Sequence, residues 1–361
     1  MAGTNATLNL SAVNGERSEG GEPLLVHVGG AKDARLAELR YGLGSLIWRG
    51  PVGADAIGEL EADPVTGRDA LFDFATYERA HQERPDLLMG APVVTARVAV
   101  AFTPGYFADP KSPHGLGHFL RERAPRVHGD LIAAGHRCQL VPVLALRDVW
   151  LTDPDLLEVA IAAIDGFHGP VGVVLASFAN PLSAVTQIRG WVELLGRTGN
   201  VVALRTDEAA IGGLAHGAVA ASVGTSSSAR HLFVGRPSRE RRPRRQGFDL
   251  LHGPTLSWLG TERLDGFAVS TDDLLCDCRI CDGRSLRRLA TADAKVEALA
   301  HSMAVLQGLA HTVVTADRPP ERWADVCRAA VDTADRLNRV VEGYGLGRSV
   351  KAWASALQLT S

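Results

Sequence analysis

Four stretches decide the fold: residues 139–146 read QLVPVLAL, residues 171–179 VGVVLASFA, residues 201–217 VVALRTDEAAIGGLAHG, and residues 218–231 AVAASVGTSSSARH. Each begins with an apolar run that has no regular polar alternation, as strands buried on both faces do. Amphipathic helical stretches, such as 154–165 and 181–196, lie between the strands. This order is typical of βα units and a parallel sheet.

The same alternation extends toward the N-terminus, so we expect strands at 24–28, 94–102, 139–146, 171–177, 201–205, 218–223 and 231–234. A chain of 361 residues fits one (β/α)8 TIM-like barrel. No GxGxxG motif follows the first strand, which argues against a dinucleotide-binding open sheet. We therefore predict an α/β protein with three parts: a disordered leader (1–22), a barrel that includes a basic loop at 235–247 (23–270), and a zinc-binding helical module (271–361).

Composition excludes several classes of protein. Hydrophobic residues make up 46% of the chain and the net charge is -3, which is ordinary for a globular protein and identifies no partner. The N-terminus lacks the basic and apolar regions of a signal peptide, and no stretch reaches the roughly 18 apolar residues of a membrane span. We expect a cytoplasmic protein that does not enter a membrane.

Three of the five cysteines, Cys276, Cys278 and Cys281, fall in the hexapeptide CDCRIC. Such spacing favours thiolate metal ligands over disulfides, and free thiols so close together would be prone to oxidation. His301 or His311, both on the helical stretch that follows, supplies a fourth ligand. We predict one structural zinc ion held by the three cysteines and His301, with His311 as the alternative. An iron–sulfur cluster would need a distant fourth cysteine, Cys138 or Cys327.

Side chains just past the strand ends of a barrel face its active site. Asp207 is the best-placed carboxylate there, although capping of the next helix is an alternative role for it. The turn after the last βα strand, GTSSS at 224–228, resembles phosphate-gripping turns, and a plain loop is the alternative. The substrate-binding residues we predict are Arg205, Thr225, Ser226, Ser227 and His231.

A basic tract, GRPSRERRPRRQG, follows at 235–247 and contains a single acidic residue. Arginine suits bidentate contact with phosphate, so we predict that the tract binds nucleic acid. A solvated loop is the alternative. Its basic residues are Arg236, Arg239, Arg241, Arg242, Arg244 and Arg245.

The CDCRIC motif, the spacing to His301 and the preceding βα units together resemble the tRNA-guanine transglycosylase family, which includes enzymes that insert 7-deazaguanine bases into DNA. The resemblance covers about residues 135–310. It implies a TIM-like barrel, a structural zinc, and exchange of guanine for a 7-deazaguanine base in tRNA or DNA. It also implies a general base and a nucleophilic aspartate at strand ends.

The chain departs from this family at the residues that carry the chemistry. Ser222 stands on the last βα strand where the resemblance calls for the nucleophilic aspartate. The segment Ile211-Gly212-Gly213-Leu214 looks like the family's guanine-recognising motif but falls inside a helix, so we interpret it as a decoy. Asp73 is the nearest substitute for the family's general base, and Asp207 is the other candidate for a displaced carboxylate.

Three functions remain open from the sequence. The first is a base-exchanging transglycosylase that uses Asp207 or Asp73. The second is a non-catalytic relative that binds nucleic acid, a second copy of the chain or a catalytic partner subunit. The third is a zinc-stabilised barrel that acts on a phosphorylated small molecule and rests on the GTSSS turn alone.

Overall fold

The computed structural model describes residues 24–28, 36–37, 40–42, 46–49, 70–73, 75–79, 98–135, 137–234, 247–266, 272–339 and 347–357. The predicted leader (1–22) lies outside the described residues. So do all six arginines of the predicted basic tract.

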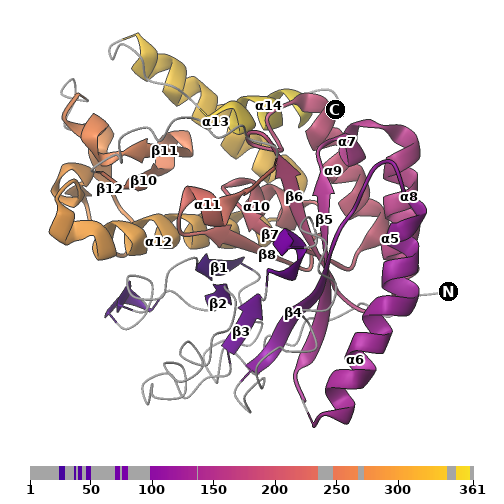
Figure 1. The fold of residues 1–361 in the computed structure, drawn as a ribbon. Coiled ribbons are helices and arrows are strands. Elements are labelled where there is room, and N and C mark those ends of the chain that lie inside the picture. The colour runs from indigo at the N-terminus through magenta and orange to yellow at the C-terminus, as the bar shows by residue number, and fades with distance from the viewer. Residues whose placement is uncertain are drawn as a thin grey trace.

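The central feature is a closed parallel barrel, seen obliquely in Figure 1. Each strand pairs in parallel with the next along the chain, and the last pairs with the first through Leu24 and Ala221. The predicted TIM-like fold is therefore confirmed. Its eight described strands are β1 (Leu24–Val28), β2 (Leu46–Arg49), β3 (Ala70–Asp73), β4 (Val98–Phe107), β5 (Gln139–Arg147), β6 (Val171–Ser177), β7 (Val201–Thr206) and β8 (Ala220–Gly224).

The barrel interior is a packed apolar core. Every barrel strand contributes side chains to one buried cluster, among them Leu25, Ile47, Leu71, Val141 and Val202. These residues alternate with others that face the outer helices, as the two-residue period of a strand requires. The polar side chains described below therefore lie at the mouth of the barrel, above this packed apolar core.

Helices cover the outside of the barrel, and a second buried cluster fills the space between the two layers. Asp153 is the N-cap of α8, because its side chain accepts hydrogen bonds from the backbone N–H groups of Asp155 and Leu156. The helical elements of this region are α4 (Thr76–Arg79), α5 (His114–His118), the π-helical turn η4 (Phe119–Arg123), α6 (Ala124–Ala133), α7 (Val149–Thr152), α8 (Pro154–Asp165), α9 (Val185–Thr198), α10 (Ala209–Ala215) and α11 (Ser227–Arg230).

A C-terminal part packs on the outside of the barrel, with its hairpins and α12 on the left in Figure 1 and α13 and α14 at the top. It has its own buried cluster, which joins Leu250 and Leu259 of a hairpin to Cys281 and to helices α12 and α13. The hairpin, which we had placed in the barrel region, thus shares a core with the cysteine motif. Its elements are β10 (Asp249–His252), β11 (Ser257–Gly260), β12 (Leu275–Cys276), β13 (Arg284–Ser285), α12 (Lys295–Val314), α13 (Pro319–Asn338) and α14 (Arg348–Leu357).

Three details differ from the sequence-based prediction. Strands β2 and β3 were not predicted, and β4 runs four residues later at its start and five later at its end than the predicted strand 94–102. The predicted strand 231–234 is the two-residue β9 (Leu232–Phe233), which pairs with β6 outside the closed ring.

No helix among the described residues is long and apolar enough to span a membrane.

Candidate functional site

The cysteine motif forms a tight turn between β12 and β13. The backbone N–H groups of Cys281 and Asp282 both donate to the carbonyl of Cys278, and the N–H of Gly283 donates to that of Cys276. Asp282 and Gly283 adopt the left-handed conformation, with φ of 50° and 74°. Such a turn brings three thiols to one side of a short hairpin.

Helix α12 supplies the fourth donor. His301 is buried, and its Nδ1 lies 3.7 Å, 3.4 Å and 3.3 Å from the sulfurs of Cys276, Cys278 and Cys281. Its Nε2 lies 2.8 Å from the carbonyl of Leu251, to which it donates a hydrogen bond, leaving Nδ1 available to a metal. The alternative ligand, His311, is exposed on the same helix.

The geometry of the four donors fits a tetrahedral metal ion. All four ligand atoms lie within 4.8 Å of one another. Bonds of about 2.3 Å to sulfur and 2.0 Å to nitrogen place tetrahedral N and S ligands about 3.5 Å apart, close to the distances found for His301. Without a metal the thiols perturb one another, since contact with Cys276 lowers the pKa of Cys278 and raises the pKa of Cys281. This cluster is able to hold a metal ion.

The metal centre connects mechanically to the barrel mouth through the β10–β11 hairpin. Leu251 of β10 accepts from His301, and its N–H donates to the hydroxyl of Ser302 on α12. Asp249, two residues earlier, pairs with Arg230 of α11 at 3.0 Å. Trp258 of β11 donates to Glu208, which lies two residues beyond the end of β7. The hairpin therefore contacts both the metal centre and the residues that follow β7 and β8.

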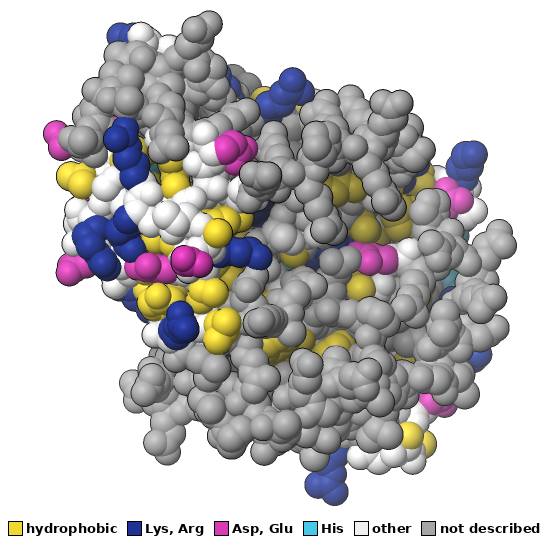
Figure 2. Space-filling model, turned by 60° about the vertical axis from the view of Figure 1, so that its left-hand side comes forward, with side chains coloured by type: hydrophobic (Ala, Val, Ile, Leu, Met, Phe, Trp, Pro, Cys, Tyr) yellow, Lys and Arg dark blue, Asp and Glu magenta, His cyan; other side chains and the backbone are white. Residues whose placement is uncertain are grey.

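The face shown in Figure 2 brings the left-hand side of Figure 1, where the C-terminal part lies, toward the viewer. Lys and Arg side chains there are interspersed with Asp, Glu and hydrophobic side chains. Ion pairs tie several arginines of this part to carboxylates, as between Arg288 and Glu297 or Arg336 and Asp273. The visible described surface is thus of mixed charge, and it adds no continuous basic patch to the predicted arginine tract.

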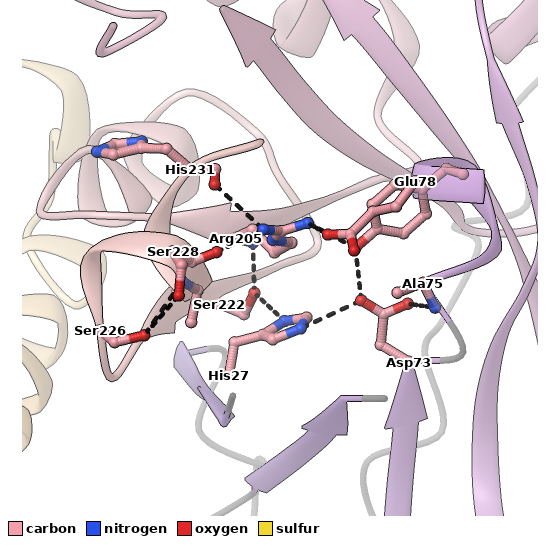
Figure 3. A network of polar contacts seen from close by, with 11 residues as sticks. His27, Asp73, Ala75, Glu78, Arg205, Ser222, Ser226, Ser228 and His231 are labelled. Carbon is pink, nitrogen blue, oxygen red and sulfur yellow. Dashed lines mark hydrogen bonds and ion pairs between the residues drawn. The ribbon is translucent and has the colours of Figure 1, made fainter. Parts of the chain in front are cut away.

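Asp73 forms the centre of a buried polar network at the barrel mouth (Figure 3). It ends β3 and is 0% exposed. Its Oδ2 accepts from the hydroxyl of Tyr77 at 2.7 Å and lies 3.1 Å from Nε2 of His27, while Oδ1 accepts from the N–H of Ala75 at 2.8 Å. Burial alone would raise the pKa of Asp73, but these contacts, led by that with His27, outweigh it and lower the pKa. Asp73 is therefore an ionised carboxylate.

Arg205 balances this charge from the opposite side of the mouth. It has a φ of 56° at a register shift between β7 and β8, and such bulges re-aim side chains at barrel rims. Its guanidinium donates to Tyr77 and Glu78 and to the carbonyls of Ser228 and His231. Arg205, which we predicted to bind substrate, therefore uses its guanidinium to connect β7 with α4 and with the turn after β8.

Ser222 is fully buried inside this network. Its hydroxyl accepts from the N–H of Arg205 at 2.9 Å and lies 3.4 Å from Nδ1 of His27. It is a structural link between β8, β7 and β1. The position that the family resemblance assigns to the nucleophile therefore holds a hydroxyl engaged with its neighbours.

Asp207 lies just beyond β7 and is buried by neighbours from two other strand ends. Its Oδ2 accepts from the amide of Asn180 at 2.7 Å and lies 3.4 Å from Nε2 of His231. Its Oδ1 accepts from the N–H of Ala209 at 3.0 Å, so it also caps the start of α10. Burial would raise the pKa of Asp207, but the contact with His231 leads the effects that lower it.

Glu208, the next residue, is held in the opposite protonation state. Burial first, and then the charge of Asp207, raise the pKa of Glu208 to about 8. Its carboxyl group contacts the hydroxyl of Ser349 and accepts from the indole N–H of Trp258 at 3.3 Å. Two adjacent carboxyl groups with pKa values moved apart are typical of acid–base sites.

Replacing Glu208 with glutamine is expected to change how stability depends on pH. The raised pKa means that the folded chain binds more protons than the unfolded chain between about pH 4.5 and 8, so unfolding becomes easier as pH rises through that window. Glutamine does not ionise, so the variant should not lose this stability as the pH rises. Urea unfolding at pH 5.5 and 8.5 should show the variant gaining about 3 kcal/mol on the wild type between the two values. Parallel pH curves for the two proteins would contradict the assignment.

Replacing Asp73 with asparagine should destabilise the chain, because His27 loses the buried counter-charge that lies 3.1 Å from its Nε2. We expect a loss of about 3–5 kcal/mol in urea unfolding. The exposed Asp130 on α6 offers a matched control, since Asp130→Asn should change stability by less than about 0.5 kcal/mol. Equal stabilities for the two variants would show that the network carries no such charge balance.

The serine turn, GTSSS at 224–228, leads from β8 into α11. Gly224 permits the turn, because a Cβ there would lie 2.2 Å from the backbone of α11. The hydroxyl of Ser226 caps α11 by accepting from the N–H of Ala229, and it lies 3.2 Å from that of Ser228. Thr225 donates its N–H to the carbonyl of His27, and the side chain of Ser227 is exposed.

Helix α10 contains Ile211 to Leu214, all buried, as the decoy interpretation predicted. Sequence reasoning missed His27, Tyr77, Glu208, Arg230 and Trp258. Of these, Glu208 offered a signal, because it adjoins Asp207 at a predicted strand end. Arg230 directly precedes the predicted His231, and the other three come from segments that gave no motif.

Comparison of the sequence with protein-family models found no match, and comparison with curated proteins found none either. The site is therefore interpreted from its own geometry.

Proposed function

We propose that this chain is a base-exchanging transglycosylase of the tRNA-guanine transglycosylase type, which acts on a purine base in tRNA or DNA. The observation that carries the proposal is the combination of a closed parallel barrel with a Cys3His cluster that joins the strand after the barrel to a buried helix. An ionised carboxylate, Asp207, at the mouth of that barrel supports it.

The chemistry that we assign to Asp207 is nucleophilic displacement. A carboxylate oxygen forms a bond to C1′ of the ribose or deoxyribose while the bond from C1′ to the base nitrogen breaks, and the electron pair leaves with guanine. His231, 3.4 Å from the carboxylate, is placed to supply the proton that the departing base takes up. The incoming base then attacks C1′, loses its proton and releases Asp207.

Asn180 holds the carboxylate for this attack. Its amide donates to the same oxygen that faces His231, while its own Oδ1 accepts from the N–H of Leu182. The loop after β6 thus fixes the amide, and the amide fixes the carboxylate. Such support lowers the entropy cost of reaching the reactive geometry.

Phe178, in the same loop, is proposed to stack on the nucleobase. It is 53% exposed, and the guanidinium of Arg147 lies 6.0 Å from its ring centroid. Exposed aromatic rings beside arginine are common platforms for bases. Phe178→Ala should therefore raise KM for nucleic acid about tenfold and change kcat little, as stacking contributes about 1–3 kcal/mol per base. Steady-state exchange kinetics measure both constants, and a change confined to kcat would contradict stacking in the bound state.

We assign zinc to the Cys3His cluster, because three thiolates and one imidazole without an open position are typical of structural zinc. Bound zinc would supply a cross-link between the cysteine turn and α12. Thiolate ligands persist best in a reducing compartment, which agrees with the expectation of a cytoplasmic protein. The arginines at 236–245 are proposed to contact the phosphate backbone.

A second function, that of a non-catalytic subunit, is favoured by one observation. The hydroxyl of Ser222 occupies the place of the family's nucleophile and is engaged with Arg205 and His27. Such a chain would bind nucleic acid together with a catalytic partner or a second copy of itself.

One assay separates the two functions. Purified protein is incubated with radiolabelled guanine and either bulk tRNA or duplex DNA, and label in the nucleic acid is counted after precipitation. The proposal predicts incorporation into one of the two substrates. Binding of nucleic acid without incorporation would favour the accessory function, and neither binding nor incorporation would contradict both.

A further inference from the structure

A cavity lies on the flank of the barrel, away from the mouth. Its volume is about 380 Å³, within the range that holds small organic ligands. It is bounded by the middle of β4, the start of β5, α6 and the loop after α8, so it separates α6 from the barrel wall. In most barrels apolar side chains fill this layer.

Two backbone irregularities line this flank cavity. Thr103 and Pro104 lie where the register between β4 and β5 shifts, between Phe102 and Gly105. Leu120 and Arg121 belong to the π-helical turn η4. Bulges and π turns both occur preferentially next to binding sites.

The inner end of the cavity contains a hydroxyl without a partner. Thr103 is 3% exposed, and no described residue forms a hydrogen bond with its Oγ1. An unpaired buried hydroxyl costs stability, so a ligand that bonds to it recovers that cost. The surrounding wall is apolar and includes Leu120, Leu140 and the ring of Phe167.

The outer rim of the cavity is basic. Arg121, His128 and His168 are exposed there, and none of the described residues that line the cavity is acidic. Arginine and histidine side chains in one rim favour a phosphate group, which accepts several hydrogen bonds at once. The apolar wall and the exposed basic rim together fit a ligand with an apolar body and an anionic end.

We propose that the flank cavity binds a nucleoside monophosphate. The base enters between Leu140 and Phe167 and bonds to Thr103, and the phosphate meets Arg121 and the two histidines. This site is separate from the barrel mouth and does not depend on the function proposed for the mouth.

Calorimetric titration of the full chain with GMP, AMP, guanosine and inorganic phosphate tests the proposal at low salt. We expect a nucleotide to bind at least about tenfold tighter than guanosine or phosphate alone, because only the nucleotide contacts both ends of the cavity. Arg121→Ala should weaken its binding about tenfold or more. Arg126→Ala is the matched control, because Arg126 is exposed on the following helix, α6, but does not line the cavity, and it should leave binding unchanged.

The Thr103→Val variant tests whether the Thr103 hydroxyl binds a ligand or serves the packing of the free protein. Removal of an unpaired hydroxyl should raise the melting temperature of the free protein and reduce the nucleotide affinity about fivefold. A lower melting temperature in the variant would mean that the hydroxyl has a structural role. Absence of nucleotide binding at millimolar concentration, or equal binding by the Arg121 and Arg126 variants, would overturn the proposal.

Discussion

Replacing Cys281 with serine is expected to abolish metal binding and to produce the largest loss of stability. Cys281 is the buried cysteine of the cluster, and the metal would join β12 and the turn that follows it to α12 across a small apolar core. Binding free energy at such sites becomes folding free energy. We expect a loss of at least about 5 kcal/mol, which lowers the melting temperature by roughly 10 °C or more.

Metal analysis of the purified protein checks this prediction directly. The wild type should contain one zinc per chain, and the variant should contain almost none. Cys138→Ser is the matched control, because Cys138 lies outside the cluster and its replacement should preserve both metal content and melting temperature. Full metal content in Cys281→Ser protein would mean that the four residues are not the ligands.

Loss of the metal should also disturb the residues at the barrel mouth, through the β10–β11 hairpin. His301 holds β10 through Leu251, and the hairpin in turn contacts Arg230 and Glu208. Treatment with a chelator should therefore reduce base exchange before the barrel itself unfolds. This effect is smaller than that of the cysteine replacement, and it depends on the proposed activity.

Replacing Asp207 with asparagine is expected to lower the rate of base exchange by a factor on the order of 10³ or more. The amide cannot form the bond to C1′, yet it retains an oxygen that accepts from the N–H of Ala209. Binding of nucleic acid should stay within about threefold, because the arginines that we assign to it are untouched. Single-turnover exchange and filter binding measure the two effects separately.

Asp148→Asn serves as the control for this experiment. Asp148 lies at the end of β5, on the same rim of the barrel, and accepts from the hydroxyl of Ser177 at 2.8 Å. It has no role in the proposed displacement, so exchange should fall by no more than about threefold. Equal losses in the two variants would indicate that exchange needs the rim to be intact rather than Asp207 itself.

Much of the fold was predictable because βα units carry strong local signals. The strands at 171–177 and 24–28 and the helix at 154–165 agree with β6, β1 and α8 residue for residue. Strands β2 and β3 have only four residues each, too few for a periodic pattern to emerge. Pro319 and Pro320 separate two helical stretches of the sequence, and in the structure they begin the second of these helices, α13, where a backbone N–H would have no helical partner.

The metal site was predictable and the network at the mouth was not. Three cysteines and a histidine have few roles other than metal binding at that spacing, so their residue types were informative. The pairing of His27 with Asp73 depends on the parallel register of β1, β2 and β3, which brings the ends of β1 and β3 to the same rim. Arg205 reaches the network through a left-handed backbone at a bulge, and no residue near it in the sequence marks that conformation.

Trapping the covalent intermediate tests the central claim most directly. Wild-type protein is incubated with the tRNA or DNA substrate without a replacement base, denatured, digested and analysed by mass spectrometry. The proposed mechanism predicts a ribosyl or deoxyribosyl adduct on the peptide that contains Asp207, and none in Asp207→Asn protein. An adduct on another residue, or base exchange that proceeds in Asp207→Asn protein at the wild-type rate, would contradict it.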